Sequence, residues 1–135
     1  MSEKPFKDQV GLITGSARGI GRSIAEDLAD WGANVVILDM DQAACDKTAS
    51  EIADKYGVKA IGIACNVTSK EHAAKAAEIV KTEFKTLNFL VNNAGVTRDD
   101  LFLKMKEEDW DLVIDVNLKG TFIMTQAFLR LMMKA

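Results

Sequence analysis

The chain has 135 residues, of which 48% are hydrophobic and 27% are charged, and its net charge is −3. This length and balance are typical of one soluble globular domain, and no cluster of lysine and arginine indicates a nucleic-acid-binding surface. No apolar run is long enough to predict a membrane span, and residues 1–9 are too polar for a signal peptide. The absence of a signal peptide favours a cytoplasmic protein.

The two cysteines and the single histidine give no sign of a reactive or metal-binding site. Cys45 and Cys65 do not have the spacing of metal ligands, so we expect free, buried thiols and no metal. His72 stands among charged residues that are typical of a solvated helix face. We assign it no catalytic role.

The first predicted elements are a strand at residues 10–14, a glycine-rich turn at 15–21 and a helix at 19–31. The strand is a short apolar run, and the helix has apolar residues at helical spacing. Those helix positions are Ile20, Ile24, Leu28 and Trp31. Gly32 is placed to end the helix.

A second strand is predicted at residues 34–39, because Val-Val-Ile-Leu is a continuous apolar run suited to a strand buried on both faces. Asp41 is placed to cap a following helix that runs to Tyr56. Gly57 is placed to end that helix. The apolar side of the helix would comprise Ala44, Cys45, Thr48, Ile52 and Tyr56.

The remaining elements are predicted in this order: a third strand at 59–64, a helix that reaches Phe84, a fourth strand at 87–91 and one long helix at 107–134. Thr68 and Glu71 have the spacing of a capping box at the start of the helix that reaches Phe84. Alternating strands and helices predict an α/β fold with a parallel sheet, helices on both faces and right-handed crossovers.

Three glycines lie between the first strand and the first helix. Gly15 permits a tight turn, Gly19 permits a phosphate to approach the backbone, and Gly21 leaves room where the helix meets the sheet. The free N–H groups at the start of the helix, together with its dipole, attract a pyrophosphate. Three glycines alone are common in turns, but in this strand–loop–helix setting they indicate dinucleotide binding.

Asp39 ends the second strand, where a carboxylate accepts hydrogen bonds from the ribose hydroxyls of an adenosine. It would also repel a 2′-phosphate, so it favours NAD over NADP. The alternative is that Asp39 only caps the next turn, for which Asp41 is better placed. Arg18 favours the opposite preference, because a guanidinium pairs with a 2′-phosphate, although a solvated loop charge explains it equally well. NADP stays an alternative.

Together these residues resemble the short-chain dehydrogenase/reductase family. Residues 14–21 have that family's TGxxxGIG form, residues 92–95 read Asn-Asn-Ala-Gly like its NNAG motif, and Asn117 falls where it keeps an active-site asparagine. The resemblance covers essentially the whole chain. It implies a Rossmann-type doubly wound sheet with strand order 3-2-1-4, of which residues 1–135 supply the N-terminal, dinucleotide-binding part.

The resemblance also implies which residues bind the cofactor. The phosphates and adenosine would be held by Gly15, Ser16, Arg18, Gly19, Ile20 and Gly21. Asn66 and Val67 would face the adenine, with the Asn66 carbonyl oxygen accepting from its amino group where many family members have aspartate. Asn93, Ala94 and Gly95 would line the nicotinamide side, although Asn and Gly are also typical of a strand-ending turn.

Two further asparagines have implied roles outside cofactor binding. Asn117 would hold a kink or a water in the long helix and feed a proton relay, whereas without the resemblance it would be an exposed polar residue. Asn92 would be structural and bond across the sheet.

The sequence departs from the family in two places. Lys85 and Asn88 replace a glycine and an aspartate before the fourth strand, which we interpret as tolerated surface changes. The family's catalytic serine, tyrosine and lysine lie further along the chain than Ala135. Tyr56, the only tyrosine, is on the second predicted helix and outside the expected pocket, so we expect this chain to be inactive alone.

Within the family, residues 93–99, Met105 and Trp110 resemble 3-oxoacyl-[acyl-carrier-protein] reductases. The resemblance implies hydride transfer from NAD(H) or NADP(H) to the carbonyl of a small or carrier-protein-linked 3-oxoacyl thioester, in fatty acid synthesis. One alternative is a family member acting on acetoacetyl-CoA, a sugar or an alcohol. Another is a non-catalytic dinucleotide-binding fragment that needs a partner chain. A homo-oligomer is expected through the helix at 107–134, as in the family's tetramers.

Overall fold

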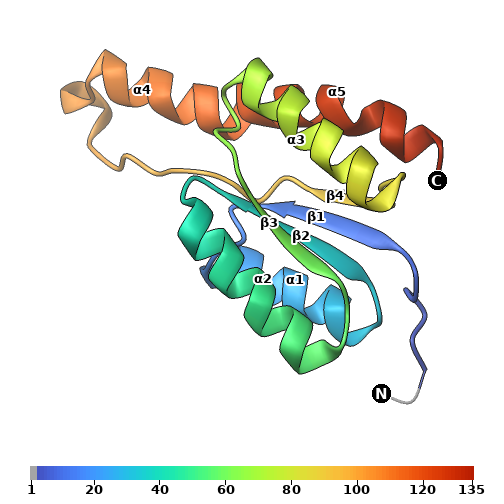
Figure 1. Cartoon of the computed structure of the whole chain (residues 1–135). Helices are drawn as coiled ribbons and strands as arrows, with labels where there is room; N and C mark the ends of the chain where they lie inside the picture. Colours follow the sequence, from blue (N-terminus) through green and yellow to red (C-terminus); the bar gives the residue numbers. More distant parts are fainter. Residues whose placement is uncertain (1–2) are drawn as a thin grey trace.

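Four parallel strands form the centre of the molecule in a computed structural model that describes residues 3–135. The strands are β1 (Val10–Thr14), β2 (Asn34–Asp39), β3 (Ala60–Ala64) and β4 (Phe89–Val91). Their order in the sheet is β3-β2-β1-β4 (Figure 1). The expected parallel α/β sheet and its strand order are therefore confirmed.

Helices cover both faces of this sheet (Figure 1). One face carries α1 (Gly19–Asp30) and α2 (Gln42–Tyr56). The other carries α3 (Lys70–Phe84) and α5 (Gly120–Met133), which pack against each other. The remaining helical segments are η1 (Phe102–Lys104), α4 (Glu107–Ile114) and the π-helical turn η2 (Asp115–Lys119).

Successive side chains of β1 and β2 point to opposite faces of the sheet and pack in two separate apolar cores. Leu12, Val36 and Leu38 point to the core under α3 and α5, where Phe128 is fully buried. Ile13, Val35 and Ile37 point to the core under α1 and α2. β2 is thus buried on both faces, as its continuous apolar run predicts.

The predicted ends of α2 are confirmed, whereas the predicted start of α3 is wrong. The Asp41 side chain accepts hydrogen bonds from the backbone N–H groups of Ala43 and Ala44, and Gly57 ends α2 with a φ of 68°. At α3 the cap is Ser69, whose hydroxyl oxygen accepts from the His72 N–H. The Thr68 N–H and hydroxyl both donate to the Asn66 side chain, so the Thr68 hydroxyl is directed at Asn66 and not at the start of α3.

The apolar side expected for α1 is only partly correct. Ile20 is 75% exposed and Trp31 is 40% exposed, while Ala25 and Ala29 lie fully against the sheet. Small side chains let the helix approach the strands closely, so the larger residues at its ends are left outside. Ile20 lies in the first turn, at the end of the helix nearest the glycine loop.

Asn88 is not the surface change that the sequence suggested. Its side-chain oxygen accepts from the Val10 N–H at 2.8 Å, and its own N–H donates to the Val10 carbonyl at 2.9 Å. The residue therefore joins the first residue of β1 to the chain entering β4. Lys85 is exposed and has a φ of 72° at the end of α3.

The predicted long helix is continuous in space but contains the π turn η2 between α4 and α5. The stretch Glu107–Met133 has 27 residues and is apolar enough to cross a membrane by length and composition, contrary to the sequence expectation. Within the described residues, however, Ile123, Met124 and Phe128 of α5 belong to the core under α3. One side of this helix therefore packs inside the protein.

Candidate functional site

A cleft of about 580 Å³ lies where the four parallel strands end. Eight of the residues expected to bind a cofactor line it, namely Gly15, Arg18, Asp39, Asn66, Val67, Asn93, Ala94 and Gly95. They lie at or just after the carboxyl ends of β1, β2, β3 and β4, so the sheet order brings together four motifs that are distant in sequence. Leu112, Asp115 and Val116 close the side beneath α4 and η2.

Ser16 is part of the glycine loop, but its side chain is buried and does not line the cleft. Its hydroxyl donates to the Ile13 carbonyl at 2.6 Å and accepts from the Leu38 N–H at 3.0 Å. The Ser16 N–H also donates to the Leu38 carbonyl, at 3.2 Å. This buried serine therefore fixes the loop to β2 instead of presenting its hydroxyl to a ligand.

Asp39 joins the glycine loop to the end of β2. One carboxylate oxygen accepts from the Ala17 N–H at 3.1 Å and the other accepts from the Met40 N–H at 2.9 Å. Asp41 caps α2, so Asp39 is not needed for that purpose. The carboxylate is held by two backbone groups while it lines the cleft, which suits an acceptor for ribose hydroxyls.

The start of α1 has the properties of a phosphate site. No side chain caps the helix within the described residues, so first-turn N–H groups are left without intrahelical partners. Gly19 has a φ of 65° and open space where a Cβ would be, while a Cβ at Gly21 would overlap the Gly15 carbonyl oxygen. An anion can therefore reach this backbone, and the residues present fit the pyrophosphate of a dinucleotide.

Thr14 is a site residue that sequence reasoning missed. Its buried hydroxyl oxygen accepts from the N–H groups of Asn93 and Ala94, at 3.0 and 2.8 Å. The Asn93 side chain in turn donates to the Gly15 carbonyl at 3.2 Å. Thr14 is the first residue of the TGxxxGIG form, but that motif did not reveal its contacts. Its hydroxyl holds the segment after β4 against the glycine loop.

The Asn66 side chain is oriented by its neighbour Thr68. Its oxygen accepts from the Thr68 N–H at 3.0 Å and from the Thr68 hydroxyl at 2.7 Å. A backbone N–H only donates, so this pairing fixes which amide atom is the oxygen. Because that oxygen already has two donors, the amide nitrogen is the group left to face a ligand. The Asn66 N–H itself donates to His72 Nδ1.

Asn117 does not line the cleft but holds a segment that does. From the π turn, its side-chain oxygen accepts from the Val96 N–H at 2.8 Å and its amide nitrogen donates to the Val96 carbonyl at 3.0 Å. Asn117 lies within this π turn, which interrupts the α-helical hydrogen bonding between α4 and α5. Asn92 instead donates to the Thr125 hydroxyl of α5, at 3.2 Å.

The remaining reactive side chains are unsuited to nucleophilic chemistry or lie elsewhere. Burial raises the pKa of the Cys65 thiol to about 11. Burial and then the nearby Asp39 charge raise the pKa of the Cys45 thiol to about 11 as well. Both cysteines are free and buried, as expected. Tyr56 donates to a Glu26 oxygen at 3.3 Å, away from the cleft.

A family model described as short chain dehydrogenase matches residues 9–135. The chain belongs to this family. A member from Aquifex aeolicus (strain VF5), 3-oxoacyl-[acyl-carrier-protein] reductase FabG, is 48% identical over 132 residues, which are 98% of this chain and 53% of the relative. The FabG of Escherichia coli (strain K12) is 40% identical over 129 residues, covering 96% of this chain and 51% of the relative. The chain thus spans about half the length of these family members.

Solved structures of dehydrogenases have the same fold. An NAD⁺-bound xylitol dehydrogenase has a TM-score of 0.91 and is 31% identical, over 97% of this chain and 50% of the other. The L-sorbose reductase of Gluconobacter frateurii, solved with NADPH and L-sorbose, has a TM-score of 0.90 and is 26% identical, over 96% and 49%. The Rossmann-type arrangement is confirmed, and these neighbours hold nicotinamide dinucleotides of both kinds.

Proposed function

We propose that the protein containing this chain reduces the keto group of a 3-oxoacyl thioester carried by acyl carrier protein, in the cytoplasm. The observation that carries the proposal is the cleft, in which residues from four strand ends surround an uncapped helix start and a carboxylate. The relatives that are 48% and 40% identical are 3-oxoacyl-[acyl-carrier-protein] reductases. In the reaction, hydride passes to the carbonyl carbon and a proton to its oxygen.

We assign residues 1–135 the role of a dinucleotide-binding domain. The start of α1, with Gly19, Ile20 and Gly21, binds the pyrophosphate. The adenosine lies toward Asp39, Asn66 and Val67, because β2 and β3 are on that side of β1. The nicotinamide supplies the hydride when it is bound, and it lies toward Asn93, Ala94 and Gly95 after β4. Arg18 and Gly15 line the cleft between the adenosine side and the nicotinamide side.

The cofactor preference that we propose is NAD(H) over NADP(H). The Asp39 carboxylate accepts hydrogen bonds from the ribose and repels a 2′-phosphate at the same place. Arg18 also lines the cleft, and its guanidinium would offset part of this repulsion.

We assign Asn117 to positioning and expect the proton donor to come from a tyrosine outside residues 1–135, assisted by a lysine and a serine. Asn117 fixes the segment at Val96, which borders the nicotinamide side of the cleft. Tyr56 cannot serve as the donor, because its hydroxyl bonds to Glu26 between α1 and α2. A neutral acid near the carbonyl oxygen is required to complete the reduction.

The alternative substrate class is a sugar or polyol, as in the names of the xylitol dehydrogenase and the L-sorbose reductase of similar structure. The discriminating experiment is a steady-state assay of the full-length protein with NADH or NADPH and, in turn, acetoacetyl-acyl carrier protein and L-sorbose. We expect cofactor oxidation with the thioester. Oxidation with the sugar alone would overturn the proposed substrate, and no cofactor binding at all would overturn the whole assignment.

A further inference from the structure

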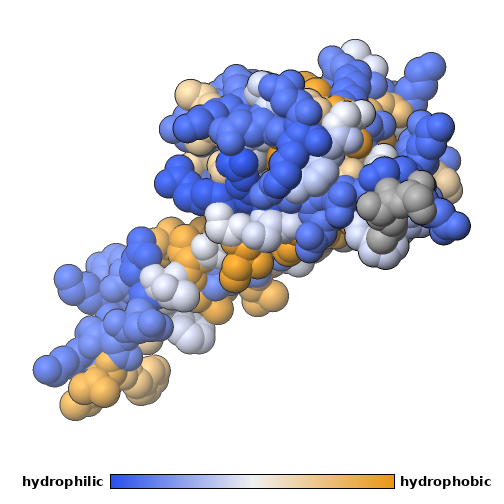
Figure 2. Space-filling model, turned by 90° about the horizontal axis from the view of Figure 1, so that it is seen from below, coloured by the Kyte–Doolittle hydropathy of each residue, from blue (hydrophilic) through white to orange (hydrophobic). Residues whose placement is uncertain are grey.

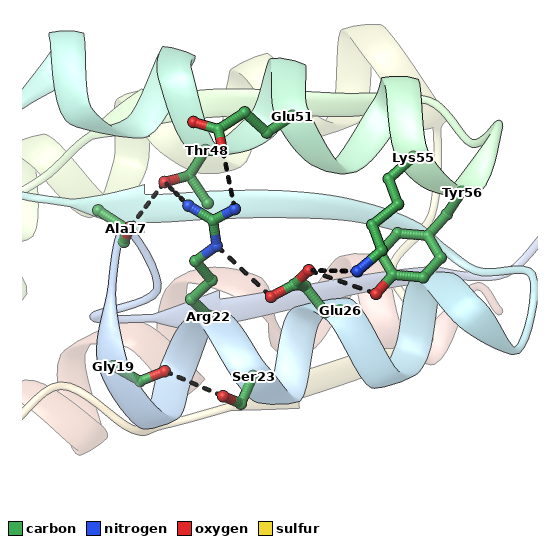
Figure 3. A network of polar contacts seen from close by, with 9 residues as sticks. All are labelled: Ala17, Gly19, Arg22, Ser23, Glu26, Thr48, Glu51, Lys55 and Tyr56. Atoms are coloured by element: carbon green, nitrogen blue, oxygen red, sulfur yellow. Dashed lines mark hydrogen bonds and ion pairs between the residues drawn. The ribbon is translucent and has the colours of Figure 1, made fainter.

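We propose that Thr48 of α2 is a positioning residue for the cofactor, because it fixes one peptide group of the glycine loop. Thr48 is only 2% exposed, and its hydroxyl donates to the Ala17 carbonyl at 2.6 Å. The two residues are 31 positions apart, so the contact joins α2 to the loop before α1 (Figure 3). The inference rests on the proposed function, since it concerns how the same cleft holds the dinucleotide.

The contact between Thr48 and the Ala17 carbonyl also sets the direction of the Arg18 N–H, because both groups belong to one trans peptide. The C=O of one residue and the N–H of the next point in opposite directions across a planar trans peptide, and residues 3–135 contain no cis peptide bond. With the Ala17 carbonyl directed at α2, the Arg18 N–H must point away from α2. Arg18 lines the cleft, and its N–H has no protein acceptor among the described residues. The Arg18 N–H is therefore available to an oxygen of the cofactor.

The peptide before it is fixed from the other side. The Ala17 N–H donates to Asp39 at 3.1 Å, so the two polar backbone groups of Ala17 are held by side chains from β2 and α2. If the Thr48 hydroxyl is removed, the buried Ala17 carbonyl loses its donor. The peptide between Ala17 and Arg18 is then free to rotate, and rotation would take the Arg18 N–H out of the cleft.

A polar network holds Thr48 in place between the two helices. Arg22 of α1 pairs with Glu51 of α2 at 3.1 Å and with Glu26 at 3.5 Å, and it also donates to the Thr48 hydroxyl at 3.5 Å (Figure 3). Tyr56 and Lys55 extend the same network through Glu26 (Figure 3). The network contains a matched control, because Tyr56 also contributes one hydroxyl to it but does not touch the loop.

The test compares Thr48→Val, Thr48→Ser and Tyr56→Phe in the full-length protein. Dissociation constants for NADH are measured by calorimetric titration, and thermal unfolding is followed alongside. We expect Thr48→Val to weaken NADH binding by about fivefold, the usual effect of one lost hydrogen bond. Thr48→Ser should restore the affinity, and Tyr56→Phe should lower the melting temperature without changing the affinity.

Several outcomes would overturn the inference. One is an unchanged NADH affinity in Thr48→Val, and another is equal weakening in Tyr56→Phe, which would reveal a general effect of α2 stability. Failure of the unaltered protein to bind NADH would instead contradict the proposed function.

A second measurement needs no variant and keeps the inference testable if Thr48→Val does not fold. Amide resonances of the unaltered protein are recorded by NMR while NADH is added. The Arg18 amide proton should move strongly downfield as it acquires an acceptor, while the Ala17 amide should move less because Asp39 already holds it. An Arg18 amide that does not respond to NADH would overturn the inference.

Discussion

At the scale of single residues, the Asp39 carboxylate has two roles, one in the glycine loop and one in the cleft. It accepts the Ala17 N–H from the glycine loop and lines the cleft where we place the ribose. Removing the side chain therefore takes away both the loop contact and the repulsion of a 2′-phosphate. Removing only the charge, while keeping an oxygen that accepts the Ala17 N–H, separates the loop contact from the repulsion of a 2′-phosphate.

We predict that Asp39→Ala narrows the preference for NADH over NADPH by at least about tenfold, because the 2′-phosphate of NADPH is no longer repelled by a carboxylate. A tenfold change in the ratio of dissociation constants corresponds to about 1.4 kcal/mol. Calorimetric titration of both cofactors measures the ratio. Asp39→Asn is the companion variant, since its side-chain oxygen still accepts the Ala17 N–H. It should gain NADPH affinity with a smaller loss of NADH affinity, and an unchanged ratio in both variants would show that Asp39 does not face the 2′ position.

Asn66 leads to a second prediction, which concerns the adenine. Its oxygen accepts from Thr68, so its amide nitrogen is a donor at the place where we propose the adenine, whose amino group is also a donor. In Asn66→Asp one oxygen can keep Thr68 while the other accepts from adenine. We expect this variant to favour NADH over nicotinamide hypoxanthine dinucleotide by about tenfold more than the unaltered protein does. Equal ratios of the two dissociation constants would place Asn66 away from the purine.

At the scale of elements, local signals predicted β2 and α2 well, because each boundary has a residue with one dominant use. Asp41 caps α2 and Gly57 ends it, as expected from either residue alone. The start of α3 was wrong because Thr68 and Ser69 are adjacent hydroxyl residues, and the choice between them depends on the Asn66 side chain. Such competition is not visible in the spacing of a capping box.

In the cleft, too, the local motifs could be predicted from the sequence, whereas the tertiary contacts between them could not. Part of its lining was predictable, since the glycine loop, Asp39 and residues 93–95 each lie at the carboxyl end of a strand. What holds these motifs together was not predictable. Thr14 bonds to Asn93 across 79 positions and Thr48 to Ala17 across 31. Thr14 and Asn93 belong to two separate motifs, but neither motif shows that the two residues are in contact.

The π turn between α4 and α5 supports a prediction at this scale. Asn117→Ala removes both hydrogen bonds to Val96, so the segment that borders the nicotinamide side should loosen. We expect faster hydrogen exchange at the Val96 amide and a lower kcat of the full-length enzyme by about tenfold or more.

Thr125→Val is the matched control for Asn117→Ala. It removes the hydrogen bond between Asn92 and α5 but leaves Val96 untouched. Similar changes in both variants would attribute the effect to the helix as a whole and would contradict a positioning role for Asn117.

At the scale of the whole molecule, no tyrosine, histidine or lysine is among the described residues that line the cleft. We predict that this chain alone reduces no ketone at a measurable rate, because correctly placed acid catalysis is commonly worth about 10²–10⁴-fold. The assay uses highly purified chain with NADH and a 3-oxoacyl thioester. Turnover that is lost in Asn117→Ala would contradict the expectation that the proton donor lies outside these residues.

The surface of the molecule is uneven in a way that bears on association. Figure 2 shows a hydrophobic tip on the part of the molecule that extends from the sheet and carries α4, whereas much of the surface in this view is hydrophilic. The most exposed apolar residues of this region are Leu101, Phe102 and Leu103, at 69%, 87% and 94%. On the helix at 107–133, the exposed apolar side chains are Trp110, Leu112, Leu118, Phe122, Leu129 and Met133. This surface exceeds the scattered apolar residues usual on a monomer.

The last prediction is that the chain of residues 1–135 does not persist as a free monomer. Among the described strands, β4 pairs with β1 on one side only, so its outer N–H and C=O groups form an open edge. Phe89, Leu90 and Val91 of that edge are only partly buried, and β4 contacts α5, whose exposed side chains include Phe122, Leu129 and Met133. The open edge of β4 and the exposed apolar side chains of α4 and α5 together favour an oligomer, a complex with a complementary chain, or aggregation. Sedimentation velocity of the purified chain is the test, and a single stable monomer at micromolar concentration would refute the prediction.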